Sequence, residues 1–129
     1  MKKFLLILTL ALLAGFASKA QEDDNDKIRD KMREFIQKRL NLTRNEAERF
    51  TPVFIRYFRE WKQTLHENRA DGLVRQQKII ELRLRYRTEF RDIVGEKRSN
   101  DVYRQQDIFI HEIKEMREEQ IKARRTERP

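Results

Sequence analysis

Residues 47–65 read AERFTPVFIRYFREWKQTL, and their apolar side chains predict an amphipathic helix. At 100° per residue these side chains fall within about 100° of arc, which is the width of a single buried face. The face consists of Ala47, Phe50, Phe54, Tyr57, Phe58, Trp61 and Leu65. Pro52 lies inside the stretch and deletes one backbone hydrogen bond, so a kink is expected there. A strand over residues 53–58 is the alternative.

The start of this helix is marked by the segment Leu42-Thr43-Arg44-Asn45-Glu46. The Thr43 hydroxyl can accept a hydrogen bond from the backbone N–H of Glu46, while the Glu46 carboxylate can accept one from the N–H of Thr43. This reciprocal pair is a capping box, and Leu42 is placed to pack on Ala47 as a hydrophobic staple. Glutamine would close the box as well as glutamate does. We expect the helix to cover about residues 44–66.

Apolar periodicity predicts three further helices, over about residues 26–39, 71–94 and 99–124. Their apolar positions are Ile28, Met32, Phe35 and Ile36 in the first, Ile79, Leu82, Tyr86, Phe90 and Ile93 in the next, and Val102, Gln106, Phe109, Ile113 and Met116 in the last. Gly95 is placed to stop the middle one. The steps of four and three in the last resemble a coiled-coil seam. The expected fold is all-α, with about four amphipathic helices in a thin, elongated, curved and hairpin-like arrangement.

The helix predicted over residues 71–94 also has apolar residues away from its main face. Leu73, Ile80 and Leu84 lie on the other side, which Arg87 and Arg91 extend with charge. A helix that is apolar on two sides must bury the second side against something. The alternatives are a contact with the last helix or a misjudged helix axis, a homodimer seam, and a surface for client proteins. These five residues are the candidate protein-binding site.

The N-terminus has the three parts of a secretory signal peptide. Met1-Lys2-Lys3 is basic, residues 4–14 are uncharged and apolar, and small residues precede a cleavage point after Ala20. The apolar run is too short for a membrane anchor, which needs roughly 20 residues. We therefore expect residues 1–20 to be a signal peptide. Residues 21–129 are expected to form a single, soluble helical domain outside the cytoplasm, with no membrane span.

The composition of the chain after this leader favours thin helices. Without residues 1–20, which hold three lysines and no acid, 27 basic and 22 acidic residues remain, a net charge of +5. High charge with low hydropathy is also typical of disorder. Aromatic residues at helical spacing argue against disorder, and narrow apolar stripes on long helices account for the composition. The basic surface would favour acidic client proteins.

The junction at residues 40–46 resembles the Leu-Thr-x-x-Gln motif of the Spy/CpxP-type periplasmic proteins, with Glu46 in the Gln position. The next residues, Ala47 to Phe54, resemble family versions with an aromatic residue and a proline in the same helix. The resemblance implies a curved, often dimeric helical cradle in the periplasm. Members bind unfolded or stressed proteins without ATP, regulate envelope-stress signalling or sense metals. We therefore expect an ATP-independent chaperone or envelope-stress adaptor. The alternative is a sensor subunit of an envelope signalling system, with or without metal.

Other chemistries have little support in the sequence. It has no Gly-rich phosphate loop, no nucleophile elbow and no Ser/His/Asp grouping, so we expect no catalytic residues and no cofactor. His66 and His111 are weak metal candidates, which could meet if the second and fourth helices pack together, but they lack the spacing of a metal-binding motif. Basic and acidic residues alternate rather than forming a one-sign stripe, so a nucleic-acid partner is not expected.

Overall fold

Residues 24–128 are described by the computed structural model, and every regular element among them is a helix. The chain divides into two units, residues 1–31 and residues 32–129. In the first unit the described residues, 24–31, are helical. The predicted signal peptide and its cleavage point lie outside the described residues. The expected all-α fold of four helices is confirmed.

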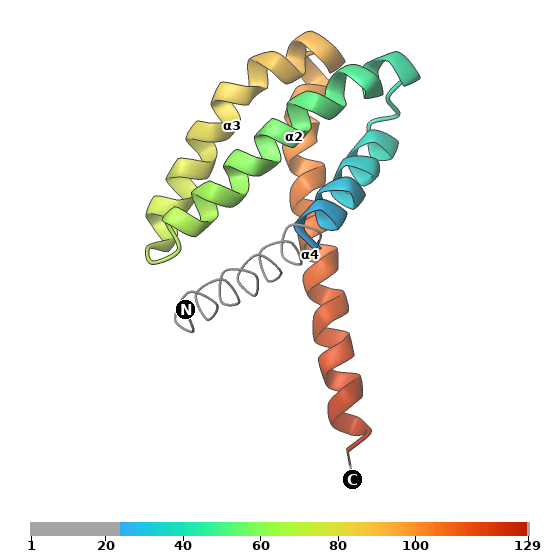
Figure 1. The fold of residues 1–129 in the computed structure, drawn as a ribbon, viewed down its shortest axis with the longest axis vertical. Coiled ribbons are helices and arrows are strands. Elements are labelled where there is room, and N and C mark those ends of the chain that lie inside the picture. The colour runs from blue at the N-terminus through green and yellow to red at the C-terminus, as the bar shows by residue number, and fades with distance from the viewer. Residues whose placement is uncertain (1–23, 129) are drawn as a thin grey trace, which may run out of the picture. The chain divides into compact units, whose positions relative to one another are not determined.

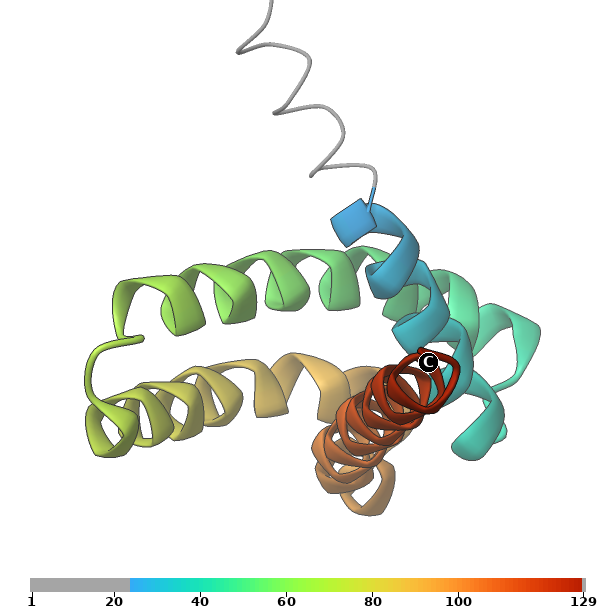
Figure 2. The same cartoon turned by 90° about the horizontal axis from the view of Figure 1, so that it is seen from below.

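The second unit begins with helical residues 32–39 and continues with α2 (Arg44–Glu67), α3 (Gly72–Val94) and α4 (Glu96–Thr126). Helices α2 and α3 run side by side in opposite directions, and α4 starts at the far end of α3 (Figure 1). Packing is sequential, α2 against α3 and α3 against α4. Figure 2 shows the antiparallel pair from below, with α4 coming toward the viewer. The alternative of a strand over residues 53–58 is wrong, because these residues lie within α2.

Helix α2 starts at the predicted capping box. The Thr43 hydroxyl accepts from the Glu46 N–H at 3.2 Å, and the Glu46 carboxylate accepts from the Thr43 N–H at 3.0 Å. The helix continues through Pro52 without interruption. Pro52 removes the hydrogen bond to the carbonyl of Glu48, and both residues are exposed. Water can therefore satisfy that carbonyl, which lowers the cost of the proline.

One residue, Gly95, separates α3 from α4. Its N–H donates to the Arg91 carbonyl at 2.9 Å, and its own carbonyl accepts from the Ser99 N–H at 3.0 Å. Gly95 therefore ends one helix and starts the next, with φ 90° and ψ 166°. The predicted stop at Gly95 is confirmed, but α4 begins at Glu96, three residues before the predicted start. The sequence suggested a short linker, whereas the glycine makes the turn alone.

Aromatic side chains of α2 and α3 fill the core of the second unit. The Phe90 ring centroid lies 5.3 Å from that of Phe50 and 5.8 Å from that of Tyr57, and Tyr57 lies 5.5 Å from Tyr86. These spacings suit edge-to-face and tilted ring contacts. The other buried apolar side chains are Met32, Ile36, Leu40, Val53, Phe54, Phe58, Leu82, Val94, Val102 and Phe109. The main apolar faces predicted for α2 and α3 are therefore the buried ones.

Candidate functional site

The ends of the predicted apolar faces open into a groove shared by α2, α3 and α4. We call it the α3 groove, and its volume is ≈ 450 Å³. Its lining residues are Trp61 and Leu65 of α2, Arg75, Gln76, Ile79, Ile80 and Arg83 of α3, and Asp107, Ile110 and Lys114 of α4. Five of these side chains are large and apolar, and three carry a positive charge. The groove is thus lined by apolar side chains together with charged ones of net positive charge, and we call these charged side chains its rim.

A cluster of polar side chains joins one wall of this groove to the core. The Arg83 guanidinium donates to both carboxylate oxygens of Asp107, at 2.8 and 3.3 Å, and to the amide oxygen of Gln106 at 2.9 Å. It also donates to the Tyr57 hydroxyl at 3.2 Å, and that hydroxyl donates to Gln106 at 2.5 Å. The Tyr103 hydroxyl donates to the Arg83 backbone carbonyl at 2.6 Å. Arg83 therefore links all three helices.

Tyr57 and Arg83 of this cluster each keep one protonation state near neutral pH. Burial raises the pKa of Tyr57 to about 12, so its hydroxyl stays protonated and remains a donor. Burial alone would lower the pKa of Arg83, but its bonds to Asp107 and Tyr57 outweigh that effect and raise the pKa.

Because Asp107 pairs with Arg83, the rim cations without such a carboxylate partner are Arg75 and Lys114. Neither forms an ion pair with another residue in the described part of the chain.

The candidate protein-binding residues of α3 lie on its outer surface. Leu73, Ile80 and Leu84 are 80%, 58% and 50% exposed. Leu73 and Leu84 are therefore not buried against α4, whereas Ile80 lines the groove that α4 shares. The homodimer seam and the client surface remain as alternatives. Arg87 and Arg91 are exposed as well. We call these five residues the outer stripe. It joins the groove at Ile80, which belongs to both.

The residues of the helix-cap motif have a second role, in tying α2 to α4. The Arg98 guanidinium forms a two-pronged ion pair with the Glu46 carboxylate, with one bond of 3.2 Å. It also donates to the Val94 carbonyl at 2.8 Å and to the Leu40 carbonyl at 3.4 Å. The hydrogen bonds from Arg98 and then from the Thr43 backbone hold the pKa of Glu46 below its ordinary value. Glutamine could keep the cap but not this ion pair, so Glu46 has a second contribution that the capping box alone did not predict.

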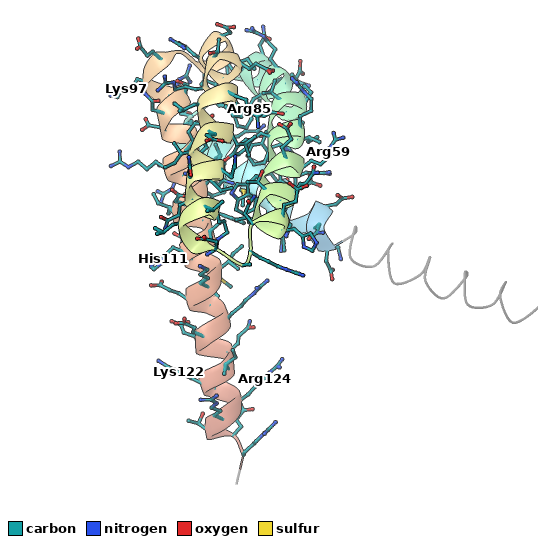
Figure 3. The ribbon with its side chains drawn as sticks, turned by 90° about the vertical axis from the view of Figure 1, so that its left-hand side faces the viewer. Arg59, Arg85, Lys97, His111, Lys122 and Arg124 are labelled. Atoms are coloured by element: carbon teal, nitrogen blue, oxygen red, sulfur yellow. The ribbon has the colours of Figure 1, made fainter. Side chains whose placement is uncertain are left out.

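The two histidines lie on exposed surfaces of different helices. His66 is in the last turn of α2, and His111 pairs with Glu115 of α4 at 3.0 Å. Within residues 24–128, no group of three or more His, Cys, Asp or Glu side chains could hold a metal ion. Nor does any helix in this range have the length and apolar character needed to cross a membrane. Figure 3 shows His111 pointing into open space.

Arg83 and Arg98 were missed by the sequence reasoning. On a helical wheel Arg83 lies at the edge of the apolar arc of α3, about 20° beyond Phe90, and Arg98 falls inside the arc of α4, one turn before Val102. An arginine inside or beside an apolar arc is the signal that could have identified each as a partly buried, paired residue.

Comparison with known proteins adds no relative. The sequence matches no protein-family model, and no curated protein or solved structure is significantly similar to it. The helices of the described residues place the protein in the all-α class. The resemblance of residues 40–54 to the Spy/CpxP-type proteins stays a prediction from those residues alone.

Proposed function

We propose that this protein is an exported, ATP-independent binding protein, a periplasmic chaperone or envelope-stress adaptor that holds unfolded or partner proteins. The observation that carries the proposal is the outer stripe, where Leu73, Ile80 and Leu84 are at least half exposed beside an apolar groove. Large apolar side chains gathered on a surface usually mark an interaction site. The groove and the stripe are continuous, so an extended segment of a client could contact both.

The size of this surface suits weak, reversible binding. Burying one large apolar side chain of a client yields roughly 1.5–3 kcal/mol. Two or three such contacts give a gross gain of about 3–9 kcal/mol, from which the cost of ordering the client must be subtracted. The resulting dissociation constant is micromolar at the strongest and extends to millimolar and weaker. Release then needs no ATP, because thermal dissociation at such affinity is fast.

The rim of the groove favours acidic residues next to the apolar ones of the client. Arg75 and Lys114 lie at its edge without a carboxylate partner, and Arg87 and Arg91 extend the stripe. After removal of residues 1–20 the chain carries a net charge of +5, so acidic segments are also attracted at a distance. The supported ligand is an unfolded segment of mixed apolar and acidic character.

The test is suppression of aggregation of several denatured proteins by the purified protein. We expect Leu84→Ser to weaken suppression, because it removes half-exposed apolar surface from the stripe. Ile121→Ser is the matched control, since Ile121 is 52% exposed on α4 and outside both the groove and the stripe. Equal loss in both variants would contradict the proposal. A silent Leu84→Ser would do the same.

Occupancy of the groove can be read directly, because Trp61 is the only tryptophan and lines it. Titration with an apolar–acidic peptide should change Trp61 fluorescence, and Ile80→Ser should weaken the response. A peptide of the same apolar residues with lysine in place of the acids should bind more weakly, since it meets the cationic rim. Identical affinity for the two peptides would remove the rim from the binding site.

Charge reversal tests whether the stripe captures clients electrostatically. We expect Arg87→Glu with Arg91→Glu to slow client capture, most at low salt because exposed charges are screened beyond about 8–10 Å at physiological ionic strength. Arg59→Glu with Lys62→Glu changes the net charge equally on the exposed surface of α2, where Arg59 points away from the fold (Figure 3). Slowing by both pairs would indicate a net-charge effect only. Suppression limited to one protein among many would favour the sensor alternative.

A further inference from the structure

Helix α4 carries a heptad seam that continues beyond the part of α4 that packs against the other helices. Its four buried residues are Ser99, Val102, Gln106 and Phe109, in steps of three, four and three. These are the a and d positions of a heptad repeat. The same register continues to Ile113, Met116, Gln120 and Ala123. Only the first half of the seam, from Ser99 to Phe109, is therefore buried within the protein.

The second half of the seam is uncovered. Met116 is 59% exposed, and residues 114–128 are exposed throughout. Figure 3 shows this end of α4 standing clear of the other helices of the second unit, with Lys122 and Arg124 in open space. A helical segment of this length is marginal in water unless its apolar side packs against something.

The charges beside the exposed seam specify the partner. The g positions hold Glu112 and Glu119, and the e positions hold Arg117 and Arg124. All four are exposed, and within the described residues none forms an ion pair. One edge of the seam is therefore acidic and the other basic, and a helix complementary to it is a second copy of itself.

We propose that residues 113–126 of α4 form a parallel, in-register coiled coil with the same segment of a second copy. In a parallel pair each g residue faces the e residue five positions later in the partner. Glu112 then faces Arg117 of the other copy, and Glu119 faces Arg124. By the twofold symmetry four ion pairs form, two along each edge.

The antiparallel arrangement fails on the same charges. It places g beside g and e beside e, so glutamates would face glutamates and arginines would face arginines. Parallel pairing also sets Gln120 opposite Gln120 at an a position, where two amides can bond to each other, and a polar a residue fixes register. The dimer is independent of the proposed client binding. Lys114, the groove residue in this segment, is at an outward b position and stays free.

Cysteine crosslinking tests the register, because the chain contains no cysteine. We expect Met116→Cys and Ala123→Cys each to form a disulfide-linked dimer under mild oxidation, since each d residue faces its own counterpart. Glu118→Cys, at the outward f position, is the matched control and should stay monomeric on the same gel. In an antiparallel pair, positions 116 and 123 could not both crosslink to themselves. Self-crosslinking at only one of them, or at position 118 equally, would overturn the proposal.

Light scattering and a charge swap test the interface without cysteines. The purified protein should be dimeric, and Met116→Lys should weaken the dimer more than about tenfold, because both copies lose an apolar d residue. Glu119→Arg should also weaken it, and adding Arg124→Glu should restore it. The circular dichroism of each variant reports whether the rest of the protein stays helical. A monomer at every concentration, a dimer indifferent to Met116→Lys, or a charge swap without rescue would overturn the proposal.

Discussion

The hydroxyl of Tyr57 connects the core to the α3 groove, and Tyr57→Phe removes it while keeping the ring. The hydroxyl donates to Gln106 at 2.5 Å and accepts from Arg83 at 3.2 Å. The ring contacts with Phe90 and Tyr86 do not involve it. The variant therefore isolates the contribution of two hydrogen bonds, one neutral and one with a charged donor.

The expected loss follows from what the partners keep. A neutral hydrogen bond contributes about 0.5–1.5 kcal/mol and one to a charged group about 1.5–3 kcal/mol. Gln106 still accepts from Arg83 at 2.9 Å, and Arg83 still pairs with Asp107 at 2.8 Å, so neither is left without a partner. We therefore expect the lower end of the summed range, about 2 kcal/mol. For a domain of this size the melting temperature falls by about 4–8 °C per kcal/mol.

Urea and thermal unfolding, followed by circular dichroism, would measure this loss. Arg83→Met and the double variant complete a cycle, and we expect a coupling energy of about 0.5–3 kcal/mol because the two residues share the cluster. Unchanged unfolding of Tyr57→Phe would refute the reasoning. Strict additivity of the two substitutions would refute it as well, since the contacts of Tyr57 and Arg83 would then be independent.

Three further outcomes are expected. Thr43→Ala should lower the free energy of unfolding by about 0.5–2 kcal/mol, while Thr43→Ser should not, because serine keeps the capping hydroxyl; equal melting curves for all three chains would show that the cap does not stabilise α2. The pKa of Glu46 is lowered in the folded state, so its contribution is complete above its ordinary value of 4.5 and is lost as the pH falls below that value. Glu46→Gln should therefore lower the melting temperature at pH 7 but by less at pH 3, and a difference independent of pH would contradict the ion pair with Arg98. Mass spectrometry of protein from the exporting cell should show loss of residues 1–20, and a full-length species extracted only with detergent would contradict the signal peptide.

Local chemistry in the sequence predicted the helices closely. The capping box at Thr43 and Glu46 and the stop at Gly95 depend on residues within one turn of each other, so their pattern is visible without the fold. The apolar spacing predicted which sides of α2 and α3 are buried. It also separated the exposed side chains of Leu73, Ile80 and Leu84 from the main face.

Contacts between distant residues were not predictable in the same way. Glu46 and Arg98 are 52 positions apart, and Arg83 meets Tyr57 across 26 positions. In a chain with 30 basic and 22 acidic residues, many pairings are compatible with the sequence. Which carboxylate meets which guanidinium is decided by the packing of α2, α3 and α4. The α3 groove is a product of the same packing, and its lining combines residues from both the predicted faces and the polar positions between them.

The junction at Gly95 determines how freely the sequence can change at that point. A Cβ there would meet nothing within 4 Å, so space alone would permit any residue. Its φ of 90° with ψ 166° is nevertheless a conformation that essentially only glycine adopts. In a library of all substitutions selected for folded protein, position 95 should be depleted as strongly as the buried Phe90. Mutational tolerance at this exposed site is therefore limited by the backbone conformation. The turn between α3 and α4 strongly favours glycine at position 95.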